Sequence, residues 1–228
     1  ELSYVREAAR LADIGMDAFL AHLAVGRREL ELAGAVYGAL LRAGSGIAAS
    51  PINLVSGERS AYSHGAPTER AIAAGDNVNV EFGATFKRYT ATIGRQFVMG
   101  KPTSLMRDLH DIVRSASDAM IARVRDGAAA IDVHEAARQV IAAAGLERYR
   151  VHLSGYGLGP SFPPGWAEPL HLIDGTTYTL RSGMVITIEP PVFIGDEGLG
   201  VRIIDKVIVT ADGAELLATS PRDLIEIG

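Results

Sequence analysis

Gly75-Asp-Asn-Val-Asn-Val-Glu81 and Gly183-Met-Val-Ile-Thr-Ile-Glu189 follow one pattern: a glycine, two residues, an aliphatic residue, one residue, a second aliphatic residue and a glutamate. Apolar side chains that alternate with a period of two are typical of a β-strand. Both glutamates therefore take the same position on a predicted strand. Pro190 and Pro191 follow the second glutamate, and because proline has no N–H to donate, that strand has to end or bulge there. A carboxylate beside such a break commonly faces a cleft.

The segments that precede these strands are also similar to each other. Residues 17–44 and 118–145 align without a gap and share seven identical positions. A duplication that covers about residues 17–100 and 118–210 explains the pattern, and chance similarity between helices rich in alanine and glycine is the alternative. In a duplicated chain the two sheets join about a pseudo-two-fold axis, where the two glutamates converge. No linker separates the halves, so we predict one domain over residues 1–228.

The rest of the chain alternates between helical and strand-like patterns. Apolar residues at three- and four-residue spacing predict four helices: one from Leu2 to near Gly26, and others at about 29–42, 104–125 and 131–144. Residues 77–98 alternate with a period of two and predict a β-meander, and strands with Gly/Pro turns follow Arg150. Residues 50–69 are rich in Pro, Gly and Ser and predict an irregular segment. The fold class is therefore α/β, of the α+β kind.

Composition narrows the class of function. The 228 residues carry a net charge of −5 with no basic cluster, which disfavours nucleic acid and anionic membranes as partners. No cysteine is present, so disulfides, thiol nucleophiles and cysteine-based zinc sites are excluded. The N-terminus is amphipathic and charged, unlike a signal peptide or a membrane span. We expect a cytoplasmic protein that acts on a small molecule.

Three residues carry the predicted chemistry. Two carboxylates a few ångströms apart can have different pKa values, so that Glu81 and Glu189 divide the roles of acid and of base or nucleophile. His64 lies in an irregular segment beside Gly65 and Pro67, where a rigid loop can present it as a general acid or base. The alternative for each glutamate is a solvated side chain or a salt bridge. Of the other histidines, His152 and His171 flank a glycine-rich segment and remain candidates.

That glycine-rich segment, residues 154–166, contains Tyr156 and the only tryptophan, Trp166. It lacks the Gly-Lys-Ser/Thr ending of a phosphate-binding loop, and no helix pattern follows it. A rigid wall with aromatic faces for a small ligand is one interpretation. A purely structural cluster of turns is the other.

Five motifs in order make the chain resemble the pita-bread superfamily of creatinase, methionine aminopeptidase and prolidase. They are SHG-x-P at 63–67, GDNVNVEFGA at 75–84, GYGLG at 155–159, MVITIEPPVF at 184–193 and GVRIIDKVIVT at 200–210. The resemblance implies a fold of two pseudo-symmetric halves, each helix-helix-strand, with helices covering a curved, mostly antiparallel sheet.

The metal-dependent members of that superfamily bind two metal ions through two Asp, one His and two Glu. The matching positions in this chain are Glu81, Thr92, Tyr156, Glu189 and Ile204. Two carboxylates without an imidazole are a poor site for a divalent transition metal. We therefore expect neither a metal nor another cofactor.

The loop GYGLGPSFPPGWAEP at 155–169 and the glutamate at position 81 most resemble the ectoine-hydrolase branch, which like creatinase works without metal. This resemblance implies C–N hydrolysis of a small cyclic amidine or guanidino acid, with Glu81 as nucleophile or base, His64 as proton shuttle and Glu189 bound to cationic nitrogens. Gly94 departs from the creatinase pattern, where a glutamate precedes the arginine of that strand. Substrate contacts are expected at Tyr156, Trp166, Thr92 and Arg202; Arg202 would hold a substrate carboxylate or, equally, form a structural ion pair.

Two-domain relatives of this type carry a smaller N-terminal domain and dimerise. We expect this chain to lack that domain and to form a homodimer.

Two alternatives to the metal-independent hydrolase stay open. One is a divergent Xaa-Pro dipeptidase or aminopeptidase that needs metal, and the other is a catalytically inactive module used for binding.

Overall fold

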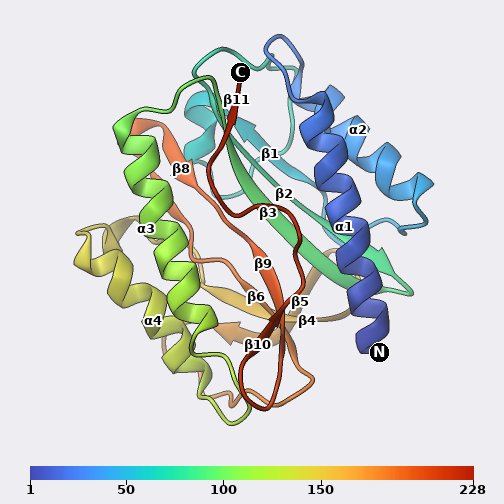
Figure 1. Cartoon of the computed structure of the whole chain (residues 1–228), viewed down its shortest axis with the longest axis vertical. Helices are drawn as coiled ribbons and strands as arrows, with labels where there is room; N and C mark the ends of the chain where they lie inside the picture. The colour runs from blue at the N-terminus through green and yellow to red at the C-terminus, as the bar shows by residue number, and fades with distance from the viewer.

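The computed structural model describes residues 1–228 and contains four α-helices arranged as two pairs around a central sheet (Figure 1). The helices are α1 (Leu2–His22), α2 (Glu29–Arg42), α3 (Ser104–Ile121) and α4 (Ala130–Ala143). The strands are β1 (Asn53–Ser56), β2 (Asn77–Phe86), β3 (Tyr89–Met99), β4 (Gly155–Phe162), β5 (Gly165–Leu172), β6 (Val185–Ile188), β7 (Val192–Ile194), β8 (Leu199–Val201), β9 (Asp205–Val209), β10 (Ala214–Leu216) and β11 (Ile225–Ile227). Three short 3-10 helices cover Gly57–Ala61, Glu147–Tyr149 and Gly195–Glu197.

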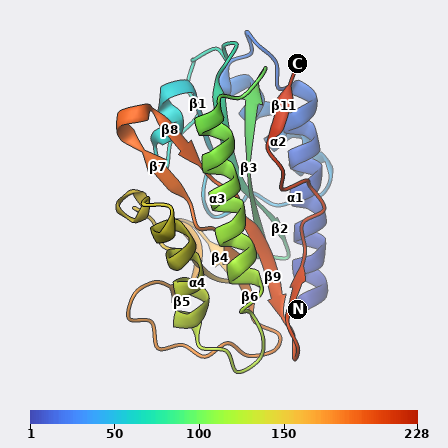
Figure 2. The ribbon, with the colours of Figure 1, turned by 60° about the vertical axis from the view of Figure 1, so that its left-hand side comes forward.

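Nine strands form the main sheet, in the order β1-β2-β3-β4-β6-β9-β10, with β11 beside β3 and β5 beside β4. All its strand pairs are antiparallel except β11 with β3. Helix α1 packs on β2 and β3 and α2 on β1, whereas α3 packs on β6 and β8 and α4 on β5, each pair over its own hydrophobic core. In the view of Figure 2, β3 appears between α3 and α1. The predicted mixed fold of helices on a mostly antiparallel sheet is confirmed.

Most predicted element boundaries agree with the structure within a few residues. Helix α3 ends at Ile121, four residues earlier than expected. The next amides make local turn bonds, such as Val124 N to Ile121 O, after which Asp126 N donates to Thr210 O at 2.9 Å and Gly127 N to Leu180 O at 2.9 Å. The segment expected to be irregular contains β1, since buried Leu54 and Val55 pair it with β2.

The two halves meet at one point that also positions the glutamates. Gly94 of β3 and Ile204 exchange backbone hydrogen bonds of 3.1 and 3.0 Å. A Cβ atom added at Gly94 would lie 2.8 Å from Ile204 Cγ1, so this approach requires glycine. Glu81 is the β2 residue opposite Gly94, and the amide of Glu189 donates to Ser154 O at 2.9 Å. Both glutamates therefore stand near the seam between the halves.

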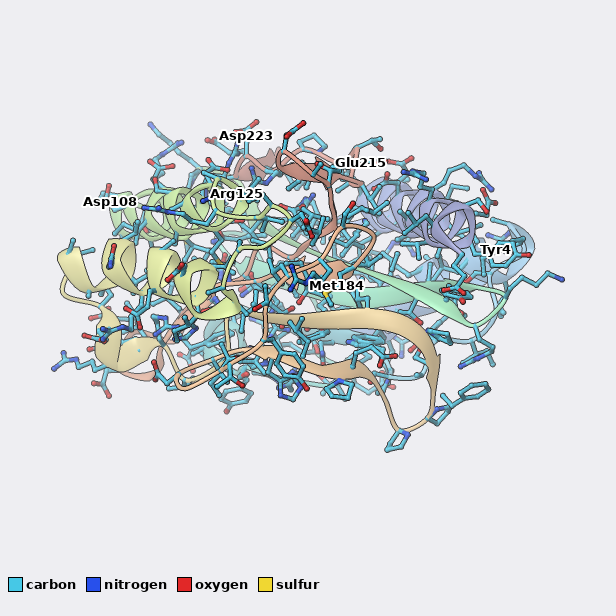
Figure 3. All side chains as sticks on the ribbon, turned by 90° about the horizontal axis from the view of Figure 1, so that it is seen from below. Tyr4, Asp108, Arg125, Met184, Glu215 and Asp223 are labelled. Carbon is cyan, nitrogen blue, oxygen red and sulfur yellow. The ribbon has the colours of Figure 1, made fainter.

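Charged side chains such as Asp108 and Asp223 point away from the sheet into solvent (Figure 3). None of the helices combines the length and the apolar character that crossing a membrane requires.

Candidate functional site

A cavity of about 360 Å³ brings together four of the predicted site residues. It is lined by Ser50, Pro51, Asn53, His64, Glu81, His152, Tyr156, Gly165, Trp166 and Ala167. These residues come from β1, β2, β4, β5 and the segments before β1, β2 and β4, so the cavity depends on both halves of the chain.

Glu81 is a buried carboxylate with one oxygen already occupied. Its Oε2 accepts hydrogen bonds from Asn53 Nδ2, at 3.0 Å, and from Arg202 Nη1. No hydrogen bond of the structure involves Oε1, and the side chain lines the cavity, so this oxygen is available to a ligand. Charge-assisted bonds of this kind fix a carboxylate firmly in orientation.

Arg202 is bound within the protein rather than open to a substrate. It pairs with Glu81, donates through Nη2 to the carbonyl of Ser63, and lies 5.5 Å from the centre of the Phe193 ring. Arg202 is 5% exposed and does not line the cavity. Of the two roles expected for Arg202, the structure shows the ion pair, and both terminal nitrogens of the guanidinium donate within the protein.

Glu189 is buried, and neither of its oxygens has a hydrogen-bond partner of good geometry. Burial and the negative charge of Glu81 raise the pKa of this carboxyl well above its usual range, against the opposing effects of Arg202 and the Tyr156 hydroxyl. The carboxyl is therefore held towards its protonated, neutral form. The Nδ1 atom of His152 lies 3.8 Å from the Oε1 atom of Glu189.

Two histidines face each other beside the glutamates. The rings of His64 and His152 are 5.2 Å apart, and both line the cavity. Burial, and then the charge of Arg202, lower the pKa of His64, while Glu81 acts in the opposite direction. Burial also lowers the pKa of His152. Both imidazoles are thereby favoured as neutral proton acceptors. Sequence reasoning kept His152 only as a candidate; its place beside the glycine-rich segment was the available signal.

The aromatic residues of that segment form one wall. Trp166 Nε1 donates to the Tyr156 hydroxyl at 2.8 Å, and both side chains are buried. Burial and the two nearby glutamates raise the pKa of Tyr156 well above its usual range, so the phenol stays neutral. Tyr156 is positioned in turn by a 2.9 Å bond from its amide to Thr187 Oγ1.

Thr92, for which we expected a substrate contact, lies away from the cavity. It is completely buried, it does not line the cavity, and its hydroxyl has no partner. Although Thr92 lies opposite Gly83 in the β2–β3 ladder, two positions from the Glu81–Gly94 pair, other residues cover it. The expectation came from the match between Thr92 and a metal-ligand position of the superfamily, and such a match does not tell what packs over the side chain.

The donor atoms present do not fit a centre with two metal ions. Among the five superfamily positions only Glu81 and Glu189 offer carboxylates, and Arg202 already binds the first. Ile204 packs against Gly94 and offers no donor. The one group of three clustered metal-capable side chains in the chain, His134, Glu135 and Asp174, excludes both glutamates. Transition metals in proteins bind through more donors than two carboxylates.

Paired helices over a sheet whose two halves each contribute a glutamate define a pita-bread domain. The model of metallopeptidase family M24 matches residues 3–211, and the chain belongs to this family. The pita-bread superfamily predicted from the sequence is thereby confirmed.

The similar proteins carry peptidase names. An Xaa-Pro dipeptidase of Pyrococcus furiosus is 32% identical over 225 residues, which is 99% of this chain and 63% of that protein. The uncharacterized peptidase YqhT of Bacillus subtilis is 30% identical over 99% of this chain and 62% of its own length. The solved Xaa-Pro dipeptidase from Bacillus anthracis superposes with a TM-score of 0.94 at 30% identity, covering all of this chain and 62% of that one. The chain thus spans less than two thirds of these relatives, and their names match the Xaa-Pro alternative better than the creatinase branch.

Proposed function

We propose that this domain hydrolyses a C–N bond of a small substrate that carries a positive charge, and that it does so without a centre of two metal ions. The observation that carries the proposal is the pair of buried carboxylates, Glu81 bound to Arg202 and Glu189 with no partner, beside two histidines. Buried polar atoms without partners are rare in proteins, and at Glu189 a ligand would supply the missing hydrogen bonds.

The protonation states support a division of roles. Neutral His64 or His152 can accept a proton from the attacking water as its oxygen bonds to the substrate carbon. Protonated Glu189 can donate its proton to the nitrogen that leaves when the C–N bond breaks. The free Oε1 of Glu81 can bind the cationic group of the substrate or act as nucleophile. An amidinium or guanidinium carries the positive charge that a metal ion would otherwise provide at this place.

Hydrolysis of an Xaa-Pro dipeptide is the second candidate, and the names of the similar proteins favour it. The M24 family name implies metal-assisted hydrolysis, whereas the donor atoms around Glu81 and Glu189 do not fit such a centre. A domain without catalytic activity is the remaining alternative, because lost metal ligands are compatible with lost catalysis.

One experiment separates the three candidates. Metal content of the purified protein is measured, and creatine, ectoine and Xaa-Pro dipeptides are tested as substrates with chelator and with added Mn²⁺ or Co²⁺. The proposal is supported if an amidine or guanidino acid is turned over in the presence of chelator and if Glu81→Gln abolishes this turnover. Glu197→Gln, which changes an exposed glutamate, is the matched control. Turnover of Xaa-Pro that requires metal supports the second candidate. No turnover and no stoichiometric metal supports the inactive domain.

A further inference from the structure

A second cavity, of about 280 Å³, lies next to the first, and His152 lines both. The second cavity contains Arg150 in its wall, together with His134 and Asp174. The first cavity has no lysine or arginine among its lining residues, and Arg202 is bound to Glu81. Arg150 is therefore the one permanent cation that lines either cavity.

Arg150 lacks the counter-charge that buried arginines of this chain otherwise have. Its Nη2 donates to Ser154 Oγ at 2.9 Å, and no carboxylate lies within ion-pair distance. By contrast, the buried Arg95 pairs with Asp205 at 2.9 Å. Burial lowers the pKa of the Arg150 guanidinium, with Asp174 and Glu147 opposing the effect from farther away. A partly desolvated guanidinium with free donors is well suited to bind a carboxylate.

Ser154 connects this guanidinium to the reacting groups. The Ser154 hydroxyl accepts the Arg150 bond, and its carbonyl accepts the bond from the amide of Glu189 at 2.9 Å. His152, two residues along the chain, lies 3.8 Å from the Glu189 carboxyl. A ligand carboxylate bound by Arg150 would thus lie beside the wall that His152 shares with the first cavity.

We propose that Arg150 is the anchor for the carboxylate of the substrate, so that the preferred substrates are small amino or guanidino acids with a free carboxylate. This inference rests on the proposed function, whether the substrate is an amidine or guanidino acid or an Xaa-Pro dipeptide. The rest of the substrate would extend past His152 to Glu81 and Glu189.

Removing the charge of Asp174 should have the opposite effect on carboxylate binding to removing the charge of Arg150. It lines the same cavity and accepts from His134 Nε2 at 3.1 Å, while 78% of its side chain is exposed. Its negative charge repels a bound carboxylate. Asp174→Asn keeps the shape and removes the charge, and we expect it to tighten carboxylate binding severalfold.

The test compares binding of proline, prolinamide, glycine and inorganic phosphate by calorimetry in wild type, Arg150→Gln, Arg150→Lys and Asp174→Asn. Arg148→Gln is the matched control, because Arg148 is exposed and contacts only Tyr149. We expect the wild type to bind proline more tightly than prolinamide, and Arg150→Gln to weaken proline binding about ten- to a hundredfold. Arg150→Lys should restore part of that loss, and Arg148→Gln should change nothing.

Several outcomes would overturn the proposal. The wild type could bind proline and prolinamide equally or bind neither, or Arg150→Gln could leave the affinity for proline unchanged. Phosphate could also bind as tightly as proline, which would indicate a general anion site. For any substrate found to turn over, Arg150→Gln should raise KM for the carboxylate form and leave KM for its amide unchanged. Binding is measured without turnover, so an absence of catalysis would contradict the proposed function alone.

Discussion

Replacing the buried Lys206 of β9 should stabilise the fold by an amount that depends on pH. The side chain is completely buried, and its Nζ atom has no hydrogen-bond partner. Burial lowers the pKa of Lys206 from 10.5 to about 8, against the attraction of Asp13, with Arg95 acting in the same direction as burial. The difference from the unfolded chain corresponds to about 3 kcal/mol, at roughly 1.4 kcal/mol for each pKa unit.

The sign follows from the linkage between proton binding and folding. Between pH 8 and 10.5 the unfolded chain holds the proton of Lys206 and the folded chain releases it. The fold therefore bears the whole cost below about pH 8, and the cost disappears as the pH rises towards 10.5. Lys206→Met removes the charge at similar length, so we expect this variant to be up to about 3 kcal/mol more stable at pH 7.

Urea unfolding at pH 7 and at pH 10 measures the effect. The gain of Lys206→Met over wild type should be large at pH 7 and shrink to about 0.8 kcal/mol at pH 10. Lys101→Met, at an exposed lysine, controls for the removal of any lysine and should change stability little at either pH. A variant that is no more stable than wild type at pH 7, or whose gain is the same at both pH values, would refute the reasoning.

Three further predictions concern the seam and the cavity. The pKa of Glu189 is raised, so the fold loses stability as the pH rises above the ordinary carboxyl pKa. Glu189→Gln should therefore unfold at a higher temperature than wild type at pH 8 and at the same temperature at pH 4. Gly94→Ala should lower stability by about 1–3 kcal/mol through its contact with Ile204, and adding Ile204→Val should recover part of that loss in denaturant titrations. Trp166→Phe removes the bond to the Tyr156 hydroxyl and should cost about 1 kcal/mol in the same titrations; no change would show that the bond contributes little.

The sequence predicted the parts of the fold that depend on local pattern. Helix α2 begins and ends where the apolar spacing and the following Ala43-Gly44 indicated. The repeated strand pattern placed Glu81 and Glu189 at equivalent positions, and the structure holds them close enough for the charge of one to raise the pKa of the other. Local pattern was sufficient here because strand alternation and proline breaks act on neighbouring residues.

The contacts that the sequence could not predict join residues far apart in the chain. Arg202 and Glu81 are separated by 121 positions, and their pairing depends on how the segment after β8 crosses the seam. Arg150 has no motif around it, and it matters only because a second cavity forms beside His152. The burial of Thr92 also depends on tertiary packing, so its match to a ligand position of the superfamily did not reveal that other residues cover it.

Charge balance connects the lost metal ligands with the proposed chemistry. A dinuclear site needs several anionic donors, whereas this seam keeps two carboxylates and balances one of them with Arg202. The second, Glu189, has a raised pKa because burial and the charge of Glu81 disfavour its ionised form, so the neutral form is favoured. A cation that enters the cavity would reverse that preference, since an opposite charge nearby favours ionisation. Binding of a cationic substrate would therefore make Glu189 a stronger acid. Its proton can pass to the leaving nitrogen once water has added to the carbon and that nitrogen has regained a lone pair, which gives a site without metal a means of coupling recognition to catalysis.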